Sequence, residues 1–81
     1  MTTAHVAQEF SMAEAKSRVV YSVLRITGHD DCSCRLHELG IGEGTTVMIE
    51  RAGNPAIVRI GSSKLALSAE CLHRIKVEPV R

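Results

Sequence analysis

The stretch LHELGIGEGTTV at residues 36–47 decides how this chain folds. Its first residues are typical of a helix end, and Gly40 stands where a left-handed residue stops a helix. Ile41 can then fold back on Leu36 and seal that end. Gly44 supplies a second turn before β-branched residues. Glycines that follow a helix and enter a strand reverse the order of a phosphate-binding loop, so we expect Gly40, Ile41 and Gly44 to be structural.

The residues before this stretch predict one short helix and one strand. Residues 1–10 are expected to form a flexible polar leader with little to bury. Ser11 and Glu14 fit a capping box, which predicts a helix over residues 12–16. Residues 19–26 are rich in β-branched side chains and predict the first strand.

A second helix is predicted directly before Gly40. Asp30 or Asp31 can cap its N-terminus, where the helix dipole favours a carboxylate. Cys32, Leu36 and Leu39 follow at i, i+4 and i+7, so we expect them to form one apolar stripe. The charged residues between them are expected to face water.

From Thr45 onward the apolar residues alternate with polar ones, which indicates strands. Residues 52–55 and 61–63 interrupt the alternation and are suited to hairpin connections. Ser68 can cap a single helical turn over residues 69–73. Five short strands that each have one apolar face must close on themselves to bury those faces. We therefore predict a mainly β fold, a small five-stranded barrel with short helices.

Length and composition exclude several classes of function. The 81 residues are enough for one domain, which we expect to span residues 11–81. The net charge is +1 with one Tyr, one Phe and no Trp, so neither a basic surface nor aromatic stacking supports nucleic-acid binding. No apolar run is long enough to cross a membrane, and three cysteines do not make a disulfide framework. We expect a cytoplasmic protein that is not inserted in a membrane.

An ordered set of residues resembles a known family over residues 11–79. It comprises Leu36, Leu39, Gly40, Ile41, Gly44, Val47, Glu50, Arg51, Asn54, Pro55, Gly61, Leu65, Ala66, Leu67, Ile75 and Val77. This set is similar to the FeoA domain, the domain of ferrous iron transport protein A. The resemblance implies an SH3-like β-barrel, no enzymatic activity and no cofactor. It also implies a bacterial cytosolic protein that acts beside FeoB, the membrane ferrous-iron transporter whose cytosolic part hydrolyses GTP.

Two features depart from the family pattern. The connection over residues 52–56 is short where many relatives have a longer loop, and cysteines near residue 32 are not a hallmark of the family. Cys32, Cys34 and Cys71 are weak candidates for metal ligands, with His29, His37 or His73 as a fourth ligand. However, positions i and i+2 lie about 200° apart around a helix, so Cys32 and Cys34 would point in opposite directions. We expect Cys32 and Cys71 to be small core residues and Cys34 a half-exposed thiol, with no metal bound.

The function that we predict from the sequence is therefore docking. The accessory protein would bind the cytosolic part of FeoB and regulate ferrous iron uptake without catalysis. Candidate contact residues lie on outward strand positions and loop tips: Met48, Ala52, Gly53, Asn54, Pro55, Ile57, Ser62 and Ser63. Met48 and Ile57 can equally pack beneath the helices. A metal sensor or chaperone that uses the three cysteines is the alternative, and exposed strand edges favour weak self-association.

Overall fold

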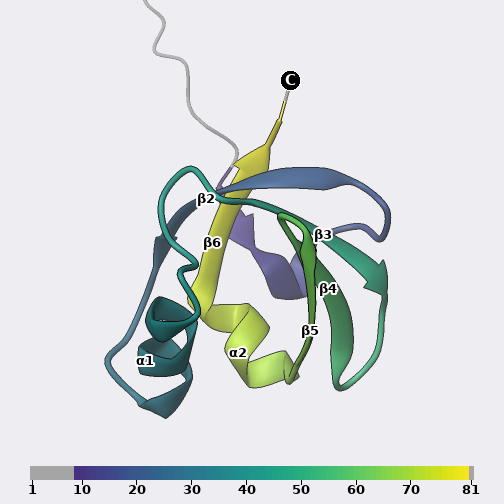
Figure 1. Ribbon diagram of the computed structural model, residues 1–81. Helices are drawn as coiled ribbons and strands as arrows, with labels where there is room; N and C mark the ends of the chain where they lie inside the picture. The colour runs from purple at the N-terminus through teal and green to yellow at the C-terminus, as the bar shows by residue number, and fades with distance from the viewer. Residues whose placement is uncertain (1–8, 81) are drawn as a thin grey trace, which may run out of the picture.

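Six antiparallel strands form one sheet in the order β1-β6-β2-β3-β4-β5 (Figure 1). The computed structural model describes residues 9–80, so the leader predicted over residues 1–10 lies mostly outside the described residues. The strands are β1 (Phe10–Ser11), β2 (Val20–Ile26), β3 (Thr46–Arg51), β4 (Ala56–Ile60), β5 (Ser63–Leu67) and β6 (Ile75–Pro79). The helices are a 3₁₀ turn η1 (Met12–Glu14), α1 (Asp31–Glu38) and α2 (Ala69–Arg74).

The period-two alternation is confirmed in β3, β4 and β6. Val47, Val58 and Val77 are at most 1% exposed. Met48 and Ile57, each next to one of these valines in its strand, are half-buried on the outer side of the sheet. The core is aliphatic apart from Tyr21, whose ring meets that of Phe10 edge-on at a centroid distance of 5.4 Å. Phe10 also pairs with Val77, so the sheet begins within the segment expected to be a leader.

The predicted closed barrel of five strands is wrong in two respects. The sheet has six strands, because the two-residue β1 adds to β6, and its edges β1 and β5 do not pair with each other. The sheet curls round as an SH3-like fold does, and α2 lies across the opening between β6 and β5 (Figure 1). Leu72 of α2 and Met12 of η1 are 5% and 0% exposed, so these helices bury the apolar face that strand closure would have covered.

The end of α1 has the predicted geometry. Gly40 has a φ of 83°, and the backbone N–H of Ile41 donates to the Leu36 carbonyl oxygen at 3.1 Å. The Gly40 N–H donates to the carbonyl oxygen of His37 at 3.0 Å, which completes a Schellman motif. The side chains of Ile41 and Leu36 are at most 1% exposed, and Gly44 has a φ of 87° at the following turn. The positive φ values, the backbone hydrogen bonds and the burial of Ile41 are those expected of a structural helix stop at Gly40, Ile41 and Gly44.

Two local predictions are wrong. Ser11 makes no side-chain cap, and only one 3₁₀ turn forms because Ala15 is already extended. Leu39 does not belong to the buried stripe of α1: it follows the last helical residue and is 47% exposed. The residue of α1 that is buried together with Leu36 is Ser33, which is 1% exposed. A polar residue can occupy that place because its hydroxyl is hydrogen-bonded.

Within residues 9–80, the helices are too short and too polar for any of them to cross a membrane.

The glycines of residues 36–47 provide a matched test of this helix end. Gly40→Ala should lower the free energy of unfolding by about 1 kcal/mol, because an L-residue is strained at positive φ. A Cβ at Gly40 would meet no atom within 4 Å, so crowding adds nothing. Gly42 also has open space but no positive φ, so Gly42→Ala is the control and should leave stability unchanged or raised. Urea unfolding measures both, and equal losses would contradict the assignment.

Candidate functional site

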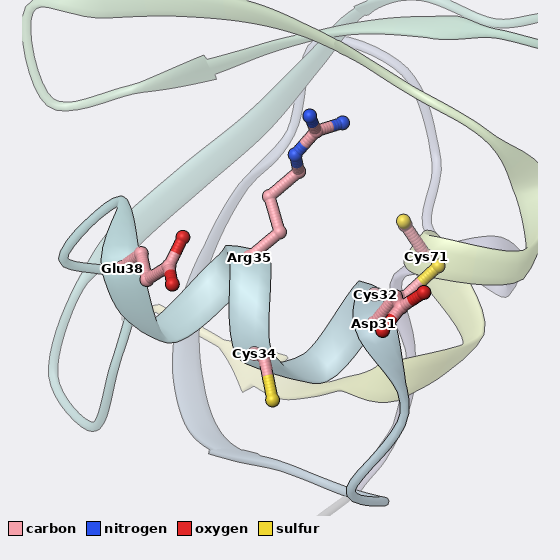
Figure 2. Close-up of a pocket in the computed structure, with 6 residues that line it drawn as sticks. All are labelled: Asp31, Cys32, Cys34, Arg35, Glu38 and Cys71. Atoms are coloured by element: carbon pink, nitrogen blue, oxygen red, sulfur yellow. The ribbon is translucent and has the colours of Figure 1, made fainter.

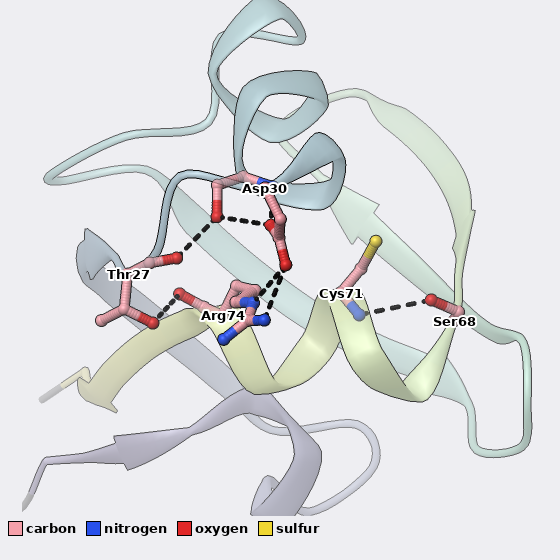
Figure 3. Close-up of polar contacts among 6 residues, drawn as sticks. Thr27, Asp30, Ser68, Cys71 and Arg74 are labelled. Carbon is pink, nitrogen blue, oxygen red and sulfur yellow. Dashed lines mark hydrogen bonds and ion pairs between the residues drawn. The ribbon is translucent and has the colours of Figure 1, made fainter.

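A polar cluster fixes α1 against α2. Oδ1 of Asp30 accepts from the backbone N–H of Ser33 at 3.0 Å, which caps α1, and Oδ2 accepts from Nη2 of Arg74 at 2.6 Å. The Ser33 hydroxyl donates to the carbonyl oxygen of Thr27 at 2.6 Å. Figure 3 shows Asp30 beside Arg74, with dashed lines between them. This cluster, defined by Thr27, Asp30, Ser33 and Arg74, joins the end of β2, the start of α1 and the end of α2.

The surroundings of the cluster favour its charged form. The Ser33 backbone N–H and the Arg74 guanidinium hold the pKa of Asp30 below its ordinary value of 3.8. Gly28 lies beneath with a φ of 88°, and a Cβ there would stand 3.1 Å from the Ser33 hydroxyl oxygen and 3.4 Å from Nε of Arg74. Glycine is therefore required both for the backbone turn and for the close approach of these side chains.

A hollow of about 470 Å³ lies beside α1 and reaches α2. We call it the cysteine hollow; its lining residues are Asp31, Cys32, Cys34, Arg35, Glu38 and Cys71. Figure 2 shows Cys34 on a different side of α1 from Cys32, as the helical spacing predicted. Cys34 is exposed, Cys32 is half-buried and Cys71 is 8% exposed.

The side chains of Cys32 and Cys71 are neighbours where α1 packs against α2 (Figure 2). The Cys71 side chain, followed by burial and the nearby carboxylate of Glu70, raises the pKa of the Cys32 thiol to about 11. Within residues 9–80, no three His, Cys, Asp or Glu side chains are grouped closely enough to hold a metal ion. His29, His37 and His73 are exposed.

A second, more apolar groove of about 620 Å³ continues from the cysteine hollow. This apolar groove is lined by Arg35 and Leu39, by Asn54 and Pro55 of the β3–β4 loop, by residues 65–68 and by Cys71. Arg35 and Cys71 line both spaces. Leu39 is the exposed apolar side chain of its rim, so the groove presents unburied apolar surface at the junction of α1, α2 and β5.

Asn54 has a structural role in this groove. Its Oδ1 accepts from the backbone N–H of Ala69 at 3.0 Å, and Oγ of Ser68 accepts from the N–H of Cys71 at 3.2 Å (Figure 3 shows the latter). The two side chains satisfy free N–H groups at the start of α2, and the Ser68 cap is as predicted. Asn54 thereby holds the β3–β4 loop against α2.

The other predicted contact residues lie on separate surfaces. Met48 and Ile57 line a hollow of about 350 Å³ with charged neighbours that include Arg18, Glu50 and Lys64. Ser62 and Ser63 are exposed at the opposite end of β4 from Pro55. Ala52 and Gly53 are exposed in the β3–β4 loop but do not line the apolar groove. The structure thus brings only Asn54 and Pro55 to this groove and Met48 and Ile57 to another hollow.

Sequence reasoning missed several residues of the site. Arg74 was not singled out, because nothing local connects it with Asp30, 44 positions away. Gly28 is not singled out by the sequence either, because its need for glycine comes from the approach of Ser33 and Arg74 in the folded chain. Leu39 was placed in the core because its spacing from Leu36 fits a buried stripe.

The architecture defines a small SH3-like β domain with an apolar groove at the junction of α1, α2 and β5. Residues 10–79 match the family model described as the FeoA domain. The chain therefore belongs to the FeoA family. No curated protein sequence matches it.

Solved structures agree with this fold. A FeoA-like protein from Clostridium acetobutylicum superposes with a TM-score of 0.83 and 23% identity, over 94% of this chain and 92% of that chain. FeoA of Stenotrophomonas maltophilia was solved with zinc and is described as a proposed ferrous iron transport activating factor. It superposes with a TM-score of 0.78 and 24% identity, over 85% of this chain and 89% of that chain. T. acidophilum IdeR superposes with a TM-score of 0.82 and 15% identity, over 96% of this chain but only 37% of the IdeR chain.

The Asp30–Arg74 pair predicts a specific acid sensitivity. Because the pKa of Asp30 is lower in the folded state, its stabilising effect is complete above about pH 5 and is lost as the pH falls through 4 and below. Asp30→Asn keeps a good helix cap but removes the charge opposite Arg74. The variant should be less stable than the wild type at pH 7, and this difference should shrink by pH 3.

Urea unfolding at pH 7, 5, 4 and 3 measures this change. Asp31→Asn is the matched control, since Asp31 is exposed and neither caps α1 nor contacts Arg74. A difference between wild type and Asp30→Asn that stays constant over this pH range would show that the ion pair does not hold α1 to α2.

Proposed function

We propose that this protein is a cytosolic, non-enzymatic accessory protein of bacterial ferrous iron uptake that docks on the cytosolic part of the transporter FeoB. Membership of the FeoA family supports the link with ferrous iron transport. The observation that carries the docking step is the apolar groove with the exposed Leu39 at its rim. An unburied apolar surface of this kind is typical of a site for a protein partner.

The groove is better suited to docking than the hollow around Met48 and Ile57. That hollow is surrounded by charged side chains that bind one another: Glu50 pairs with Arg59 at 2.5 Å and with Lys64 at 3.1 Å. A partner there would have to displace or desolvate these pairs. The apolar groove instead offers Leu39, Pro55 and Leu65, whose burial releases water without breaking an ion pair.

The walls of the apolar groove are held by contacts between its elements, which also suits it to docking. Asn54 fixes the β3–β4 loop to α2, and the Asp30–Arg74 pair fixes α1 to α2. A surface that is already ordered loses little conformational entropy when it binds. By binding one conformation of the transporter's cytosolic region more tightly than another, the protein would shift that region's equilibrium without chemistry of its own.

Leu39→Lys tests this surface. Lysine near a helix C-terminus is compatible with the helix dipole, and Leu39 is already half-exposed, so the variant should fold normally. Loss of one apolar anchor should weaken binding to the purified cytosolic region of FeoB at least about tenfold. Isothermal titration calorimetry or biolayer interferometry measures the change.

Val80→Lys is the matched control, because Val80 is 46% exposed but lies outside the groove, after β6. It should bind like the wild type. If both variants bind equally well, the groove is not the docking surface. If the wild type itself does not bind and its deletion leaves iron uptake unchanged, the proposed function is wrong.

A further inference from the structure

The proposed docking does not use the neighbouring thiols of Cys32 and Cys71. Their arrangement suggests a redox reaction that is independent of docking. Cys32 lies in the first turn of α1 and Cys71 in the first turn of α2, and these two helices pack against each other. Both side chains reach the wall of the cysteine hollow (Figure 2). Their backbones are held in place by the Asp30 and Ser68 caps. Neither cysteine is in a disulfide.

We propose that Cys32 and Cys71 form a reversible disulfide that links α1 to α2, made by exchange with a small-molecule disulfide such as oxidised glutathione. The proposal does not rest on the docking function. Cys34, which is exposed and points away from the pair, is not part of this site.

The different exposure of the two thiols assigns an order to the exchange. Cys32 is half-buried at an open hollow, so a small molecule reaches its sulfur, whereas Cys71 is only 8% exposed. The Cys32 thiolate attacks glutathione disulfide, the S–S bond of glutathione breaks, and one glutathione thiolate leaves. Cys71 then loses its proton and attacks the Cys32 sulfur of the mixed disulfide, which releases the second glutathione. Two protein thiols and one glutathione disulfide thus become one protein disulfide and two glutathione thiols.

The surroundings of Cys32 make this exchange slow at neutral pH. The thiolate is the attacking species, and the pKa of Cys32 is raised to about 11 by Cys71, by burial and by the carboxylates of Glu70 and Asp30. Asp31, Arg35 and Glu38 also line the hollow. We therefore expect the pair to be reduced during ordinary handling and to oxidise faster as the pH rises from 7 to 9.

Mass spectrometry of the full chain after incubation with oxidised glutathione tests the proposal. We expect a cross-linked peptide that joins Cys32 to Cys71, a loss of two hydrogens for that link in addition to any glutathione bound at the exposed Cys34, and full reversal by dithiothreitol. A cross-link that closes a loop of about 40 residues restricts the unfolded chain, so Tm should rise on the order of 10 °C.

Single substitutions separate the site from unspecific oxidation. Cys34→Ser should form the same cross-link and show the same rise in Tm. Cys32→Ser should form no internal disulfide, and its Tm should not change with oxidised glutathione. The test uses no substitution at the buried Cys71, so it does not depend on a variant that could fail to fold. Three free thiols after incubation, glutathione held on Cys32 without the internal link, or disulfides only between molecules would each overturn the proposal.

Discussion

The Asp30–Arg74 ion pair is the interaction on which the surface at the α1–α2 junction depends. Asp30 does two tasks with one carboxylate: one oxygen caps α1 and the other binds the last residue of α2. Both partners are more than a third exposed, so the pair adds little stability through Coulomb attraction alone. Its importance is geometric, because it fixes the position of α1 on α2, and both hollows of the surface lie at that junction.

The open sheet explains why α2 is central. A fully closed barrel would have buried its apolar face by strand pairing alone, but here β1 and β5 remain unpaired with each other and α2 covers the gap. Leu72 and Cys71 of this helix are buried in the core beneath it. Ser68 and Asn54 accept hydrogen bonds from backbone N–H groups at its start. The same short helix therefore completes the core and forms one wall of the apolar groove.

The two proposals concern neighbouring parts of one surface and have different physical bases. Docking depends on apolar area that the fold leaves exposed around Leu39, and the dithiol depends on the neighbouring side chains of Cys32 and Cys71 in the cysteine hollow. Arg35 and Cys71 border both spaces, so a cross-link between the helices would hold the wall that a docked partner touches. The FeoA family supplies the link with ferrous iron transport, whereas the dithiol proposal rests on where Cys32 and Cys71 lie in this structure.

The sequence by itself determined the local elements. The Gly40–Ile41 helix end, a cap at Asp30 or Asp31, the Ser68 cap and the alternation in β3, β4 and β6 could all be predicted, because each depends on residues within one turn or one strand. Only the tertiary structure decided the open sheet, the Asp30–Arg74 pair, the exposure of Leu39 and the meeting of Cys32 with Cys71. These features join residues from distant parts of the chain, and helical or strand periodicity carries no information about which distant partner fills the remaining space.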